Sequence, residues 1–259
     1  MTPLDLLYDI RLRANDMGGD TGTPGVGFTY YWEEDDAGCL VKNAELLRLL
    51  NRAHQELALR TSCYRDGATV EICQIAVTAG TANYAVDPRV LTIEDILLDT
   101  TGTPLVKMQL SDYRRLANHR TLTGTPTYYL EAHQPFQLTL YPVPSVDDVL
   151  YLTVYRYPLA DMAWDERNVE VTEPPETLRE ALIQGTLMLY YQKHDADTGD
   201  VNLQKFHAQE FERLVGPPVD YRILENRRWN ANLDMSLIPK GYVPRVKGTR
   251  RWFDILPGL

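Results

Sequence analysis

Two helices are predicted in the first sixty residues, because apolar residues recur there at steps of three and four. The first begins after Thr2, a capping residue, and Pro3, which suits the first helical position. The second runs from Asn43, interpreted as its cap, to about Arg60. Their apolar faces contain Leu4, Leu6, Leu7 and Ile10 in the first helix and Leu46, Leu50, Ala53 and Leu57 in the second. Glycines and an acidic run predict a long loop between them, at 15–38.

The period changes to two from about Asp66 to Pro158, where turn residues separate short runs rich in Val, Ile, Thr and Tyr. This pattern predicts a β domain. Strands are expected at 71–77, 90–98, 105–108, 136–141 and 150–155, with a short helical turn at 111–116. In each of the last two strands one face is expected in the core, formed by Phe136, Leu138 and Leu140 and by Leu150, Leu152 and Val154. Prolines in the segment 141–148 predict a turn between these strands.

Helical spacing returns after Pro174 and Pro175. The next helix has a broad apolar face, which indicates packing on two sides. This face contains Leu178, Leu182, Ile183, Leu187, Leu189 and Tyr190. A further helix is expected between the cap Asp200 and Gly216, and it carries Leu203, Phe206, Phe211 and Leu214. Residues 217–259 show no long periodicity and predict an extended arm.

These elements predict an α+β fold in three parts. Residues 1–66 and 159–216 form a helical bundle that flanks an antiparallel β domain, sandwich-like or barrel-like, at 67–158. Residues 217–259 form an extended C-terminal docking arm. The length of 259 residues and the 44% of hydrophobic residues allow a sizeable core. No apolar run approaches the length of a membrane span and the first residues do not resemble a secretory signal, so we expect a protein made in a cytoplasm, without membrane contact.

The net charge of −10 is unevenly distributed along the chain. Residues 217–259 hold eight of the 26 basic and four of the 36 acidic residues, a net charge of +4, which leaves −14 for residues 1–216. An acidic body argues against a surface that grips nucleic acid. The basic arm is typical of an interaction segment, and the alternative is that it folds back on its own acidic body.

The sequence contains no pattern typical of catalysis, of a cofactor or of a metal. The glycine-rich segment 22–27 lacks the Lys-Ser/Thr pair, the preceding strand and the following helix of a phosphate loop. The aspartates at 195–200 do not fit a calcium loop, because Phe206 occupies the position of the final acidic ligand. The acidic run 33–36 is interpreted as a solvated cluster. We therefore expect no catalytic residue, no cofactor and no metal site.

Tyrosine and the arm carry the strongest signals of binding. Tyrosine occurs 16 times against five phenylalanines, and it is frequent in the β region at Tyr128, Tyr129, Tyr141, Tyr151, Tyr155 and Tyr157. These residues suit a protein interface, or they only face the polar side of a sheet. The arm repeats a basic–aromatic pattern typical of binding hot spots. Its candidate binding residues are Arg222, Arg227, Arg228, Trp229, Arg245, Arg250, Arg251, Trp252 and Phe253.

A series of turn and strand motifs runs through the middle of the chain. They are Ala79-Gly80-x-x-x-Tyr84, Leu91-x-Ile93-x-x-Ile96, Gly124-Thr-Pro126-Thr-Tyr128, Leu138-x-Leu140-x-Pro142-x-Pro144 and Leu152-x-Val154-Tyr155-x-x-Pro158. With the helices on either side, over residues 40–215, this series resembles the head-to-tail adaptor proteins of tailed bacteriophages.

The resemblance implies a structural role in the neck of a virion. It implies a ring, commonly of twelve copies, that sits beneath the portal protein, receives the tail or nozzle protein and assembles in the host cytoplasm. It also implies that the arm at 217–259 reaches the portal. DNA would pass through the channel without specific binding, because the acidic bodies repel it.

Two other classes of protein stay open at this point. A carbohydrate-binding or receptor-binding tail component would use the tyrosine-rich sheet to bind sugars. A hydrolase with an acidic site would show metal-dependent turnover, but we find no set of residues that supports it.

Overall fold

The computed structural model describes residues 2–17, 36, 38–116, 118, 121–131, 136–170, 173–193 and 199–217. The chain divides into a unit of residues Met1–Val219 and a second unit, Asp220–Leu259, and the second unit lies outside the described residues.

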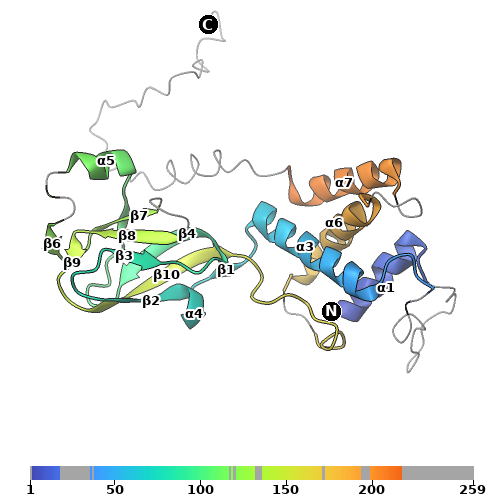
Figure 1. The fold of residues 1–259 in the computed structure, drawn as a ribbon, viewed down its shortest axis with the longest axis horizontal. Coiled ribbons are helices and arrows are strands. Elements are labelled where there is room, and N and C mark those ends of the chain that lie inside the picture. Colours follow the sequence, from blue (N-terminus) through green and yellow to red (C-terminus); the bar gives the residue numbers. More distant parts are fainter. Residues whose placement is uncertain are drawn as a thin grey trace, which may run out of the picture. The chain divides into compact units, whose positions relative to one another are not determined.

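The first unit combines helices with β-sheets (Figure 1). The helices are α1 (Pro3–Ala14), α3 (Asn43–Thr61), α4 (Val70–Cys73), α5 (Leu110–Arg115), the 3₁₀ helix η1 (Glu176–Leu178), α6 (Arg179–Tyr191) and α7 (Val201–Val215). The strands are β1 (Arg65–Asp66), β2 (Gln74–Val77), β3 (Asn83–Ala85), β4 (Val90–Leu98), β5 (Val106–Lys107), β6 (Thr123–Gly124), β7 (Tyr128–Glu131), β8 (Gln137–Tyr141), β9 (Val143–Pro144) and β10 (Asp148–Arg156). The α+β class is confirmed, whereas the domain boundaries stay predictions.

The first two predicted helices form, but one of them has a different cap. Thr2 and Asp5 make the reciprocal hydrogen bonds of a capping box at the start of α1. Asn43 is not the cap of α3, because Lys42 holds that position. The Asn43 side-chain oxygen instead accepts a hydrogen bond from Arg11 at 2.6 Å, while its backbone N–H donates to the Asp36 carboxylate at 2.6 Å. The Asp36 carboxylate therefore accepts a backbone hydrogen bond at the start of α3. The interpretation of the acidic run as a solvated cluster is wrong for this residue.

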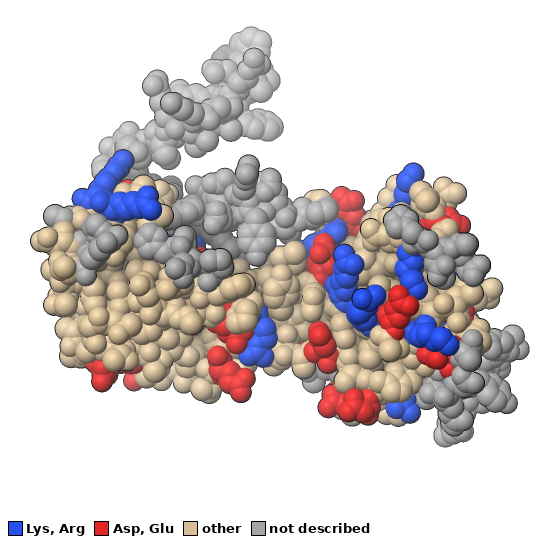
Figure 2. All heavy atoms as spheres, in the orientation of Figure 1, with Lys and Arg blue, Asp and Glu red and all other residues tan. Residues whose placement is uncertain are grey.

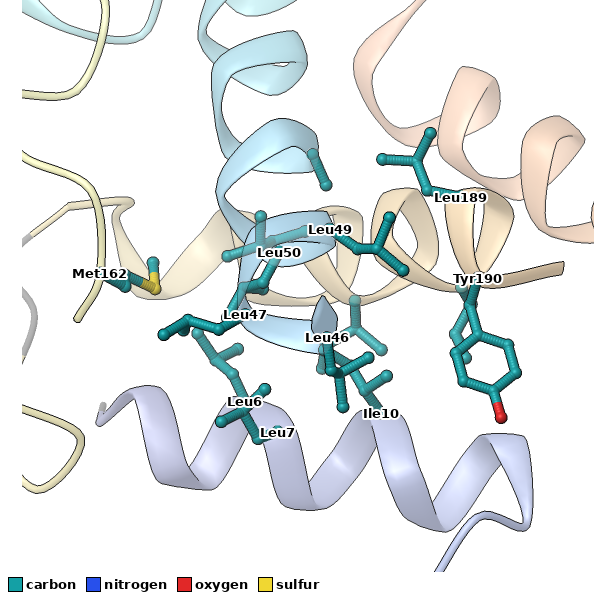
Figure 3. Packing of buried hydrophobic residues seen from close by; sticks show 14 of the residues in the cluster. Leu6, Leu7, Ile10, Leu46, Leu47, Leu49, Leu50, Met162, Leu189 and Tyr190 are labelled. Atoms are coloured by element: carbon teal, nitrogen blue, oxygen red, sulfur yellow. The ribbon is translucent and has the colours of Figure 1, made fainter. Parts of the chain in front are cut away.

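The helices share one apolar core. Figure 3 shows Leu6, Leu7 and Ile10 of α1 pointing towards the leucines of α3. The predicted stripe of α3 is buried throughout: Leu46, Leu50, Ala53 and Leu57. α6 is buried on most of its circumference, as its broad apolar face predicted, because it packs against α1, α3 and α7.

α7 packs closely on α6 through a glycine. A Cβ atom added at Gly185 would lie 3.0 Å from the ring of Phe211, so a larger side chain would push the two helices apart. Asp200 caps α7 as predicted, and Gly216, with a φ of 89°, ends it. Of the apolar residues that the helix carries, Phe211 is buried, whereas Leu203, Phe206 and Leu214 are exposed.

The strands form two larger sheets and a small pair. β10 lies between β4 on one side and β1 and β2 on the other, and these pairs are antiparallel. The second sheet has the order β3-β8-β7-β5. The prediction of an antiparallel domain is wrong for two short pairs, because β5 with β7 and β6 with β9 are parallel.

Both larger sheets contribute to one core. Its buried residues are Ile72, Cys73, Val77, Tyr84, Ile93, Ile96, Leu98, Leu105, Tyr129, Leu138, Leu140, Leu150, Leu152 and Val154. The alternation predicted for β10 is therefore confirmed.

The β region differs from the prediction in further details, and residues 143–144 of the predicted turn form β9. Residues 70–73 form α4 and only 74–77 form a strand, because the Asp66 carboxylate accepts the N–H groups of Ala68 and Thr69 and fixes a turn before α4. Phe136 is not in the core: it is 55% exposed and has a φ of 57°. β8 is covered on both faces, because Tyr141 packs with Leu130 beneath Tyr113 of α5.

Candidate interaction surfaces

The arm residues predicted to bind a partner all lie outside the described residues. They are Arg222, Arg227, Arg228, Trp229, Arg245, Arg250, Arg251, Trp252 and Phe253. Their role therefore stays a prediction.

The point where the chain leaves α7 is held by α3. The Arg60 guanidinium donates a hydrogen bond to the carbonyl of Gly216 at 3.3 Å and lies 4.9 Å from the centre of the Phe211 ring. Its Nε pairs with Glu56 at 2.7 Å, which orients the side chain. The segment that follows Gly216 thus starts from a defined position on the helical part.

An apolar notch with an acidic rim lies on the loop 159–170, between β10 and η1. Its volume is about 170 Å³, and its lining is Pro3, Ala160, Asp161, Met162, Ala163, Glu166, Val169 and Glu170. Val169, which lines the notch, is 60% exposed. Figure 2 shows Asp and Glu side chains at the lower edge of the helical part.

The notch is held in place by hydrogen bonds to α1 and α3. The Asn51 side chain donates to the carbonyl of Met162 and accepts from its N–H, both at 2.9 Å. Leu4 donates its N–H to the carbonyl of Arg167 at 3.0 Å, and the Met162 side chain is buried in the helical core. The sequence analysis missed this surface, although residues 159–176 hold six acidic residues against one arginine, which is a detectable signal.

The tyrosines of the β region do not share one surface. Tyr129 and Tyr141 are buried, and Tyr155 and Tyr157 are half-buried. Tyr128 and Tyr151 are each 38% exposed, but they belong to different sheets and alternate with residues of the shared core, so they face away from it in opposite directions. This arrangement gives no support to a single tyrosine-rich platform for sugars.

A buried polar network joins α1, α3 and α6. Arg11 is fully buried and pairs with Asp16 at 3.0 Å, and it also donates to the carbonyl of Val41 at 2.9 Å. The Asp16 carboxylate accepts the N–H of Val41 at 3.1 Å and the Tyr190 hydroxyl at 3.2 Å. Burial raises the pKa of Tyr190, and Figure 3 shows its hydroxyl directed towards the C-terminal end of α1. Periodicity could not reveal this network, because charged residues are ordinarily assigned to the surface.

A second buried ion pair lies where the strands connect to the loop 159–170. Arg156 pairs with Asp66 at 2.6 Å and with Glu173 at 2.7 Å. Burial opposes the charge on Asp66, but hydrogen bonds from Ala68, Thr69 and Arg156 outweigh it and hold the pKa of this carboxyl well below its usual range. These contacts tie β1 and β10 to the segment that precedes η1.

His54 and Tyr64 form a buried hydrogen-bonded pair, with 2.6 Å between Nε2 and the hydroxyl. Burial lowers the pKa of His54 to about 4 and raises the pKa of Tyr64. At neutral pH the imidazole is therefore uncharged and the phenol keeps its proton. Such a pair stabilises the fold and is poorly matched to proton transfer at neutral pH.

The described residues contain neither a cluster of metal-binding side chains nor a helix suited to a membrane. No group of three or more His, Cys, Asp or Glu side chains within the described ranges is placed to hold a metal ion. None of the helices in those ranges combines the length and the apolar character needed to cross a membrane.

Comparison with protein families matches residues 1–234 to the model described as SU10 adaptor protein. The match includes each helix and strand named above and continues past Gly216. Comparison with curated proteins gave no match. The chain therefore belongs to the SU10 adaptor protein family, a family of bacteriophage head-to-tail adaptors, and is a structural component of the virion that contacts other phage structural proteins.

Proposed function

We propose that the protein forms a ring, of twelve copies by the resemblance, between the portal protein and the tail or nozzle protein. The ring holds the DNA channel open and gives the tail its attachment site, with no catalytic step. It assembles in the host cytoplasm and stays in the neck of the virion. The observation that carries this proposal is the family match over residues 1–234.

The charge of the body supports a channel of this kind. Residues 1–216 carry a net charge of −14, so a closed ring of these bodies surrounds its channel with negative potential. A phosphate backbone is repelled by such a wall. DNA then passes without specific binding.

The arm supplies the contact with the portal in this proposal. Its net charge of +4 and its arginine–tryptophan motifs suit an acidic protein surface. The residues assigned to contact the portal or a neighbouring copy are Arg222, Arg227, Arg228, Trp229, Arg245, Arg250, Arg251, Trp252 and Phe253.

Electron microscopy of the purified protein mixed with its portal tests the ring directly. We expect ring-shaped complexes with the adaptor bound to one face of the portal. A mixture that yields only free portal and monomeric adaptor would overturn the proposal.

Deletion of the residues after Gly216 tests the arm. Because Gly216 ends α7 and the two apolar cores lie before it, we expect the shortened chain to keep its circular dichroism spectrum and its unfolding midpoint. We also expect weaker attachment to the portal in co-sedimentation. Attachment equal to that of the full chain would refute the role of the arm.

A further inference from the structure

We infer that the notch on the loop 159–170 receives the segment Arg227-Arg228-Trp229 from the arm of a second copy of this chain. The inference rests on the proposed function, because it names a contact between neighbours in the ring. It also assigns different partners to the two arm motifs, since Arg250-Arg251-Trp252-Phe253 then contacts the portal.

The floor of the notch suits an aromatic side chain. Ala163, Met162 and Val169 give it an apolar lining, and its volume is about 170 Å³. Tryptophan buries a large ring while its N–H reaches a polar partner, and such anchors in pockets carry much of the energy of protein interfaces.

The rim of the notch suits arginine. Asp161 and Glu166 are exposed there, and the only arginine of this loop, Arg167, lies over Trp164 with 4.9 Å between its guanidinium carbon and the ring centre. Asp161 accepts one long hydrogen bond, at 3.4 Å, from Gln55. Carboxylates of this kind bind guanidinium groups through paired hydrogen bonds, so Arg227 and Arg228 complement the charge of the rim.

The loop is already ordered before any partner arrives. The two hydrogen bonds of Asn51 to Met162 and the bond from Leu4 to Arg167 fix its backbone on α3 and α1. Little conformational entropy is then lost by the receiving side, which favours binding.

The position of the segment in the chain favours this motif over the distal one. Trp229 stands thirteen positions after Gly216, so an extended chain places it up to about 45 Å from the end of α7. This reach exceeds the roughly 30 Å diameter of a small domain, so the segment can extend beyond its own body. The family match ends at residue 234, so it includes Arg227-Arg228-Trp229 and excludes the motif at 250–253.

Photo-crosslinking in the full-length chain tests the contact. p-Benzoylphenylalanine is placed at position 229, ¹⁵N-labelled and unlabelled chains are mixed, and products are mapped by mass spectrometry with and without portal. We expect position 229 of one isotopic form to link to the peptide containing 159–170 of the other. Links confined to one chain, links to another surface, or no links between copies in either condition would overturn the inference.

Charge reversal sharpens the test. We expect Asp161→Arg with Glu166→Arg to lower the yield of inter-chain links about tenfold, the factor that roughly 1.4 kcal/mol corresponds to. Adding Arg227→Glu and Arg228→Glu to the same chain should restore it. The matched control, Asp99→Arg with Glu212→Arg, changes two exposed carboxylates outside the notch and should leave the yield unchanged. An unchanged yield in the notch variant would contradict the inference.

The fold of the variant and the formation of the ring on the portal are measured separately. If charge reversal alters the circular dichroism spectrum, Asp161→Asn with Glu166→Gln replaces it, with a smaller decrease expected. A ring on the portal combined with links outside the notch rejects the inference and keeps the proposed function. Links between copies at the notch without a ring on the portal would keep the contact between copies and reject the proposed ring on the portal.

Discussion

The helical region and the β region bury their charged residues in different places. In the helical region the pair Arg11–Asp16 lies beside the apolar core and bonds to three helices or their ends. In the β region the described core between the sheets consists of apolar residues and tyrosines, and the pair Arg156–Asp66 lies where β10 ends. Both regions have an apolar core, but the helical region places an ion pair among its helices, whereas the β region places one at the end of a strand.

Removal of the Arg11 guanidinium should cause the largest loss of unfolding free energy among the predictions made here. Arg11→Met leaves the Asp16 carboxylate buried without its cation, and such a loss costs about 3–5 kcal/mol of unfolding free energy. Denaturant unfolding followed by circular dichroism measures it. Arg13→Met on the same helix is the control, because its pair with Glu180 is 39% and 47% exposed and should be worth no more than about 1 kcal/mol. Equal losses in the two variants would contradict the electrostatic account.

The β region should respond to a loss of volume. Leu152 is buried at the middle of β10, so Leu152→Ala is expected to lower the unfolding free energy by about 3 kcal/mol through lost burial and the cavity left behind. Val146→Ala, at an exposed site in the turn before β10, should change it by less than about 0.5 kcal/mol. A small effect at Leu152 would show that the two sheets do not share a core.

Acid should lower the unfolding free energy of the protein through His54. Burial holds its pKa at about 4, below the usual value of about 6.5. As the pH falls below 6.5 the unfolded chain takes up the proton first, so the stability contributed by neutral His54 is lost progressively down to about pH 4, on the order of 3 kcal/mol. Asp66 adds a further loss only below its ordinary pKa of about 3.9, since its pKa is lowered.

The His54→Gln variant isolates this effect. Between pH 7 and pH 4.5 its unfolding free energy should fall less steeply than that of the unchanged chain. His207, whose pKa is also lowered by burial, is present in both proteins and cancels in the difference. If the unfolding free energies of the two proteins fall in parallel with pH, His54 does not contribute to the acid sensitivity.

Periodicity predicted the parts of the fold that bury apolar side chains on one face. The stripe of Leu46, Leu50 and Leu57 and the alternation through Leu150 and Leu152 are both confirmed. Hydrogen bonds from polar side chains account for one local error: Asp66 holds a turn that makes residues 70–73 helical, where a strand was predicted.

The candidate site was less accessible to sequence reasoning. The basic–aromatic arm and the acidic character of residues 159–176 could be identified from the sequence, but the shape of the notch could not, because its floor and rim come together only when Asn51 holds the loop at Met162. The interior pair Arg11–Asp16 was missed for a related reason: nothing in a local window shows that a charged residue has distant partners. The notch and the pair Arg11–Asp16 are both positioned by contacts between residues that are distant in the sequence.

The most direct test of the central claim is a cryo-electron microscopy reconstruction of the neck of the virion that contains this protein. The account predicts a ring directly beneath the portal into which the helices and strands from α1 to α7 fit, with density from each copy continuing towards the portal after α7. Density for this chain at the distal end of the tail or on a fibre, with another protein beneath the portal, would contradict it.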